Sequence, residues 1–244
     1  MERKSFISGG LAALGFAAIA PFANSCKKDS TTTATSTTTT TSSSSSDSCT
    51  ITSSETAGPY PTLVPSSYVR SNIVDGQTGV ALTIKLTFTN TNNSCAALSG
   101  ALVDIWHCTA LGYYSEYTDT PGGSYASVDY TASHFLRGRQ TTDTNGLVTF
   151  TSIFPGWYSP RAPHIHVHVY NSAGTSLLIT QIAFPTDVCN TVYTTVSPYS
   201  DRGVQDTANT ADMVFSDSLA NELSTVTGSV SAGYVLTINI GVPA

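Results

Sequence analysis

Apolar and polar residues alternate over several short stretches of the chain. The clearest case is residues 81–90, where apolar side chains occupy every second position from Leu82 to Phe88 and lysine or threonine lies between them. Successive side chains of a strand point to opposite faces, so this stretch predicts a strand with one buried face. Further strands are predicted at residues 101–107, 146–154, 164–170, 177–184 and 234–242.

Turn-forming residues separate these predicted strands. The predicted strand at residues 146–154 follows a turn that contains the pair Asn145-Gly146, and Asn-Gly favours a tight turn. Residues 218–224 are the one short helical candidate, and strands do not alternate with helices. The pattern therefore predicts an all-β fold, an antiparallel β-sandwich with long loops and little helix.

The composition supports a folded domain. Of the 244 residues, 40% are hydrophobic and 11% are charged, which provides enough apolar material for a core and argues against global disorder. The formal net charge is −6. Because an acidic chain with few lysines and arginines binds a phosphate backbone poorly, we expect no nucleic-acid partner.

The N-terminus has the layout of a secretory signal. A charged start, residues 1–4, is followed by an apolar stretch at 6–22 and by small residues directly before Cys26. The small residues before this cysteine resemble a bacterial lipobox. We therefore expect residues 1–26 to be a signal peptide with Cys26 as the lipidated residue. The protein would then be exported and anchored by its lipid to a membrane, facing the periplasm or the cell surface.

Residues 27–48 consist mainly of serine and threonine. They contain no large apolar side chains whose burial would offset the entropy of ordering the chain. This stretch predicts a disordered tether, with a single folded domain at residues 49–244.

Four cysteines lie within the predicted domain. In an oxidising compartment they allow three pairings, and their spacing does not choose among them. Cys49 opens the domain, where a disulfide would limit fraying, and Cys95 lies in a polar loop able to meet it. We predict a Cys49–Cys95 disulfide, which leaves Cys108 and Cys189 to pair. The alternative for Cys108 is a buried free thiol.

A run of alternating histidines is the first candidate for chemistry. His164, His166 and His168 share one face of a predicted strand. Neighbouring imidazoles on one face can bind a single metal ion, although a polar sheet face or packed histidines would give the same pattern.

Two tyrosine-containing segments, around Tyr114 and Tyr158, accompany the histidines. Phenolates are hard oxygen donors, so they suit a trivalent metal better than Zn(II) or Cu(I). Without the histidines, both tyrosines would be interpreted as core or rim aromatics.

Five segments together have the residue pattern of a known family. They are residues 103–115 (VDIWHCTALGYYS), 135–143 (FLRGRQTTD), 153–158 (IFPGWY), 161–166 (RAPHIH) and 178–181 (LITQ). In this order they resemble the intradiol ring-cleavage dioxygenases, which include protocatechuate 3,4-dioxygenase and catechol 1,2-dioxygenase. The resemblance covers roughly residues 49–242.

The resemblance implies a ligand set and an activity. The Fe(III) ligands carry over to the four positions Tyr114, Tyr158, His164 and His166, whereas His168 has no counterpart. The implied reaction uses O2 to cleave a catechol-like substrate to a cis,cis-muconate-type diacid.

The resemblance also implies roles for residues around the metal. Tyr158 would take up a substrate proton, Arg161 would stabilise negative charge on the ring, and Gln181 would help to hold the substrate. Tyr60, in a segment that resembles the family's Gly-Pro-Tyr motif, is implied as a substrate-pocket residue.

Two departures from the family pattern are present. The link from Tyr158 to His164 is shorter than in the well-known catabolic enzymes, and their N-terminal helical dimerisation region is lacking. The features fit an exported, single-domain branch. Three other interpretations remain open: a cupin-type metal enzyme, a secreted β-sandwich with a structural zinc or copper site, and a surface binding module without enzymatic activity.

Overall fold

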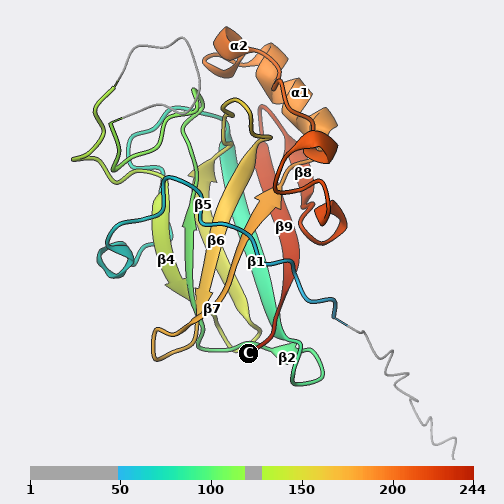
Figure 1. The fold of residues 1–244 in the computed structure, drawn as a ribbon. Coiled ribbons are helices and arrows are strands. Elements are labelled where there is room, and N and C mark those ends of the chain that lie inside the picture. Colours follow the sequence, from blue (N-terminus) through green and yellow to red (C-terminus); the bar gives the residue numbers. More distant parts are fainter. Residues whose placement is uncertain (1–48, 119–127) are drawn as a thin grey trace, which may run out of the picture. The chain divides into compact units, whose positions relative to one another are not determined.

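The computed structural model describes residues 49–118 and 128–244, which form two β-sheets and little helix (Figure 1). The predicted signal peptide, Cys26 and the predicted tether lie outside the described residues. Within the part of the chain that is described, no helix is long and apolar enough to cross a membrane.

The first sheet has β1 (Ala81–Asn90) at its centre. It pairs with β5 (Leu147–Ile153), β2 (Ala96–Ala97) and β9 (Gly233–Val242), and β9 pairs in turn with β8 (Thr225–Ser229). All of these pairings are antiparallel except β1–β9, which is parallel over nine residue pairs. The expected antiparallel order therefore has one parallel pair at the middle of this sheet.

The second sheet carries the candidate chemistry and is antiparallel throughout. Its order is β4 (Arg137–Thr141), β3 (Leu102–Trp106), β6 (His164–Tyr170) and β7 (Ser176–Ala183). In this register Trp106 and Gln181 lie on either side of His166.

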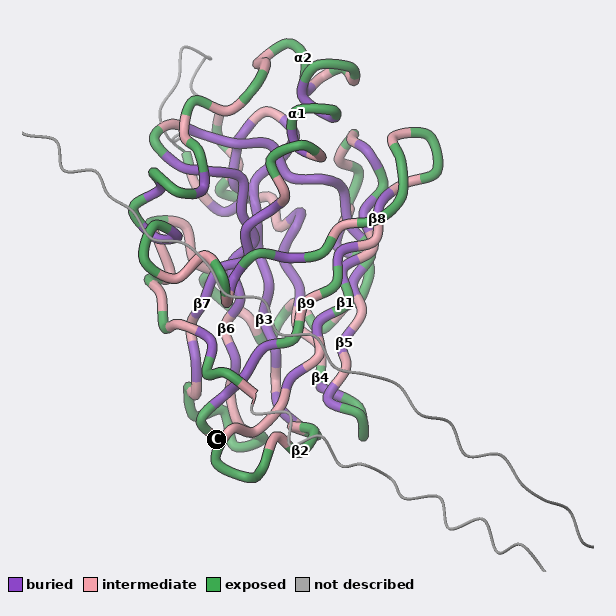
Figure 2. Tube along the Cα trace, turned by 90° about the vertical axis from the view of Figure 1, so that its right-hand side faces the viewer, coloured by how far each residue is buried: buried purple, intermediate pink, exposed green. Residues whose placement is uncertain are grey.

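The core lies between the two sheets, where buried positions run along the strands (Figure 2). The apolar face of β1 is buried as the alternation predicts. It belongs to the same cluster as the apolar positions of β3 and β6, namely Val103, Ile105, Ile165, Val167 and Val169. Because Ile165 and Val167 face the core, the histidines that alternate with them along β6 face the opposite side of the sheet.

Two helices lie beyond one end of the strands (Figure 1). They are α1 (Thr186–Thr195), which was not predicted, and α2 (Tyr199–Arg202). The helical candidate at 218–224 contains only a 3-10 turn, η3 (Leu219–Asn221). Two further 3-10 turns are η1 (Pro65–Ser67) and η2 (Asn209–Ala211).

The cysteine prediction is half confirmed. Cys49 and Cys95 form a disulfide, whereas the predicted pairing of Cys108 with Cys189 is wrong, because both are buried free thiols. They pack in different apolar clusters: Cys108 beside Trp106 after β3, and Cys189 in the main core on α1. Burial raises the pKa of the Cys108 thiol to about 12, so both its position and its protonation disfavour oxidation.

Candidate metal centre

The structure brings the four predicted ligands together. His164 Nε2 lies 3.1 Å from His166 Nε2 and 3.3 Å from Tyr114 Oη. The ring of Tyr158 meets those of Tyr114 and His164 edge to face, with centroids 5.8 and 5.5 Å apart. All four side chains are buried.

The fold explains why these histidines meet and His168 does not join them. His164 and His166 lie on β6, while Tyr114 follows β3 and Tyr158 lies in the connection between β5 and β6. The indole of Trp106 on β3 stacks on His166, with ring centroids 4.9 Å apart. His168 is one step further along the same face and only half buried. It hydrogen-bonds through its two ring nitrogens to Ser176 and Tyr170, 2.8 Å away in each case.

Hydrogen bonding and burial prepare the imidazoles to act as ligands. His164 Nδ1 donates to the carbonyl of Ala162 at 2.6 Å, which fixes the tautomer that leaves the Nε2 lone pair free. Burial lowers the pKa of His164 to about 3 and holds the pKa of His166 well below its ordinary value. Both rings are therefore neutral at physiological pH, as metal binding requires.

The two tyrosines require a cation to become useful ligands. Burial, followed by the neighbouring Tyr158, raises the pKa of Tyr114 well above its ordinary value, and burial raises the pKa of Tyr158 to about 12. Among the described residues the buried Tyr158 Oη has no hydrogen-bond partner. Such buried polar atoms are rare, and a bound metal would satisfy this one.

A buried polar chain adjoins the four side chains. Arg161 donates from Nε to Asp212 Oδ2 at 2.9 Å and from Nη2 to Gln181 Oε1 at 2.7 Å. Gln181 Nε2 then donates to the carbonyl of Thr56 at 2.9 Å. Asp212 also accepts from the amides of Ala162 and Val214, at 2.6 and 2.8 Å.

Asp212 was not predicted from the sequence. It lies 51 residues after Arg161, in a stretch without a recognised motif, so no local pattern marks it. The charge of Arg161 is therefore paired with the buried carboxylate of Asp212.

The segment of residues 56–62 covers the site, crossing the outer face of β6 and β7 (Figure 1). The ring of Tyr60 stacks on Tyr114 with centroids 4.9 Å apart and planes 16° from parallel. Gly58 has a φ of +68°, and a Cβ there would lie 3.0 Å from His166 Cε1. Glycine is therefore required both by the backbone conformation and by the approach to the histidine.

The donor set at this site mixes nitrogen and phenol oxygen. Within residues 49–118 and 128–244, no group of three or more His, Cys, Asp or Glu side chains is placed to hold a metal ion. Tyr114 Oη, 3.3 Å from His164 Nε2, and the neighbouring ring of Tyr158 provide oxygen donors beside the two histidines.

Comparison with known proteins identifies the class. A family model described as Dioxygenase matches residues 60–213, a range that contains all the candidate ligands, Arg161, Gln181 and Asp212. An intradiol ring-cleavage dioxygenase from Tetranychus urticae is 30% identical, with a TM-score of 0.70, over 80% of this chain and 96% of that one. This chain belongs to the dioxygenase family and is an intradiol ring-cleavage dioxygenase.

Other solved structures share the fold. The dioxygenase domain of a dioxygenase carbohydrate-binding protein fusion from Streptomyces sp. SirexAA-E is 25% identical over 79% of this chain and 97% of that one, with a TM-score of 0.53. The 3-chlorocatechol 1,2-dioxygenase of Rhodococcus opacus 1CP has the same fold at 19% identity and a TM-score of 0.51, over 78% and 72% of the two chains. No curated protein matches the sequence.

Proposed function

We propose that Tyr114, Tyr158, His164 and His166 bind one Fe(III) ion and that the protein uses O2 to cleave a catechol-type diol. The product would be a cis,cis-muconate-type dicarboxylate. The observation that carries the proposal is the meeting of His164 Nε2 with His166 Nε2 and Tyr114 Oη, within 3.3 Å, beside the unpartnered Tyr158 Oη.

The chemistry of the donors fits Fe(III). Two phenolates and two neutral imidazoles would leave the ion one positive charge, which a catecholate dianion can bind. Hard phenolate oxygens select a hard trivalent ion over the softer Cu(I). When bound, Fe(III) supplies the Lewis acidity and redox capacity that make the aromatic ring reactive toward O2.

The protein's own groups have separate tasks in this proposal. Tyr158 would be a phenolate only while a cation stabilises it, since burial raises its pKa to about 12. In that form its Oη, which has no hydrogen-bond partner among the described residues, would take up a proton from a substrate hydroxyl. Arg161, held by Asp212, stabilises the negative charge that develops on the substrate. Gln181 orients the substrate, and the Tyr60 ring forms a wall of the pocket.

Metal analysis combined with O2 uptake tests this proposal. The purified protein should contain about one iron per chain, by analogy with other four-ligand protein sites, and should consume O2 on addition of catechols. His164→Ala and His166→Ala should lose iron, while His168→Ala should keep both iron and activity. A wild-type protein that contains zinc or copper and ignores catechols would instead support a secreted metal-binding sandwich without dioxygenase activity.

We further propose that residues 1–26 are a signal peptide, that Cys26 carries a lipid and that residues 27–48 tether the domain at 49–244 to a membrane. The signal-like sequence supports export, as does the Cys49–Cys95 disulfide, since disulfides persist in oxidising compartments. In a fractionation experiment the wild type should sediment with membranes and Cys26→Ser should not. A Cys26→Ser protein that stays uncleaved in the membrane would contradict lipidation.

A further inference from the structure

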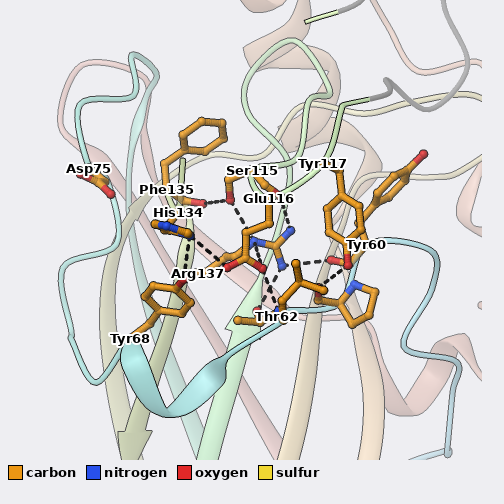
Figure 3. A network of polar contacts seen from close by, with 12 residues as sticks. Tyr60, Thr62, Tyr68, Asp75, Ser115, Glu116, Tyr117, His134, Phe135 and Arg137 are labelled. Atoms are coloured by element: carbon orange, nitrogen blue, oxygen red, sulfur yellow. Dashed lines mark hydrogen bonds and ion pairs between the residues drawn. The ribbon is translucent and has the colours of Figure 1, made fainter. Parts of the chain in front are cut away.

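The fully buried guanidinium of Arg137 hydrogen-bonds two segments of the chain, around Tyr60 and around Ser115 (Figure 3). Arg137, at the start of β4, donates from Nε to Ser115 Oγ at 2.9 Å and from Nη2 to Ser115 O at 2.6 Å. Its Nη1 donates to Tyr60 O at 3.0 Å and to Thr62 Oγ1 at 3.1 Å. Arg137 thus hydrogen-bonds both the loop next to Tyr114 and the segment that contains Tyr60.

Glu116, the carboxylate paired with Arg137, also hydrogen-bonds to the segment that follows Tyr60. Glu116 is 4% exposed, and its Oε2 lies 3.5 Å from Arg137 Nε while accepting the amide of Leu63 at 2.8 Å. Its Oε1 lies 3.1 Å from His134 Nδ1, which is 2.7 Å from Tyr68 Oη. The buried charges of Arg137 and Glu116 therefore neutralise each other, and both side chains hydrogen-bond to residues 60–63.

Residues 60–62 of this stretch belong to the segment 56–62 that covers the site. Tyr60 stacks on the proposed ligand Tyr114, while the Arg137 guanidinium lies 5.9 Å from the Tyr114 ring and 5.6 Å from that of Tyr117. A displacement of residues 60–63 would change the gap between the Tyr60 and Tyr114 rings. Because the Tyr60 ring is the proposed wall of the pocket, its position would limit the substituents that an aromatic substrate can carry.

We propose that Arg137 is a positioning residue for substrate selectivity: its buried guanidinium clamps residues 60–63 to the loop of Tyr114 and so fixes Tyr60 above the site. The selectivity part of the proposal rests on the proposed dioxygenase function, whereas the clamp does not. Lysine cannot replace arginine here. The planar guanidinium donates hydrogen bonds in several directions, to Ser115, Tyr60 and Thr62, whereas the single ammonium of lysine cannot reach all three.

The test compares Arg137→Lys with Arg139→Lys in the full chain. Arg139 lies two residues along the same strand, pairs with Asp104 and makes no side-chain hydrogen bond to residues 56–63. Hydrogen exchange of the peptide containing residues 56–63 should accelerate about tenfold or more in Arg137→Lys and stay at the wild-type rate in Arg139→Lys. Unchanged exchange in Arg137→Lys would overturn the clamp.

Steady-state kinetics test the consequence for selectivity. The ratio of kcat/KM for catechol to that for 4-tert-butylcatechol should fall about fivefold or more in Arg137→Lys, since unequal fit in a pocket is worth about tenfold or more. Bound iron should stay at the wild-type level. A ratio equal to that of the wild type, despite faster exchange, would overturn the selectivity role.

A milder variant keeps the test decisive if Arg137→Lys does not fold. Thr62→Val removes one acceptor of Arg137 without removing the charge pair, so it should change exchange and the selectivity ratio in the same direction by a smaller factor. Wild-type values of both would contradict the proposal. If the wild type itself binds no iron and turns over no catechol, the proposed function fails, and the exchange experiment still decides the clamp.

Discussion

The ion pair between Arg161 and Asp212 provides a stability prediction. Asp212 is 0% exposed, and both of its oxygens face N–H donors: Arg161 Nε and the Ala162 amide at Oδ2, the Val214 amide at Oδ1. Asp212→Asn keeps the shape of the side chain but must turn its NH2 group toward one of these donors. It also leaves the buried charge of Arg161 without a partner.

The magnitude follows from this geometry. Removing one member of a buried ion pair costs about 3–5 kcal/mol, and for a domain of this size each kcal/mol corresponds to about 2–4 °C in Tm. Asp212→Asn should therefore lower Tm by about 6–20 °C at pH 7. Burial by itself would raise the pKa of Asp212, but the hydrogen bonds from Arg161 and two amides outweigh it and hold the pKa below 3.8. The stabilisation is consequently present above pH 3.8 and is lost as the pH falls through the folded-state pKa.

Calorimetry and urea unfolding at pH 7 measure this effect. Asp217→Asn is the matched control, because Asp217 is exposed on the same connection and its substitution should change stability by less than about 0.5 kcal/mol. A loss below about 1 kcal/mol in Asp212→Asn would refute the argument, since that is the size of a surface effect.

Two further predictions concern stability. The Cys49–Cys95 disulfide closes a loop with a sequence separation of 46, so the double serine variant should lose about 2–4 kcal/mol in urea unfolding; an unchanged midpoint would contradict a structural role. Burial raises the pKa of Glu222 to about 7 from 4.5, which destabilises the folded protein as the pH rises through this window. Glu222→Gln should therefore have a Tm above that of the wild type at pH 8 and equal to it at pH 4, and a difference that does not vary with pH would argue against this cause.

Strands with a strong alternation were predictable because one face of each is buried. The predicted strands at 81–90 and 164–170 coincide with β1 and β6. Strand β4 was missed, since Arg137–Thr141 has no apolar alternation and its arginines are paired instead. Helix α1 was missed because its threonines, valines and asparagine are poor helix formers, and the helix forms by burying Cys189, Val192 and Tyr193.

The candidate site was predictable where a motif marks the residues. The four proposed ligands lie in recognisable segments, and the structure brings them together. Asp212 and the clamp of Arg137 depend on contacts between distant loops, which no local pattern encodes. The wrong pairing of Cys108 with Cys189 has the same origin, because counting cysteines does not reveal that the two thiols are buried in separate clusters.

The visible absorption spectrum of the iron-loaded protein tests the proposed ligand set most directly. Phenolate bound to Fe(III) absorbs visible light, so the wild type should be coloured, and Tyr114→Phe and Tyr158→Phe should each weaken or shift the band. Tyr113→Phe, a change at the neighbouring buried tyrosine, should leave the band unchanged. A colourless iron-loaded protein, or a band that is the same in all three variants, would contradict the proposal that Tyr114 and Tyr158 bind the metal.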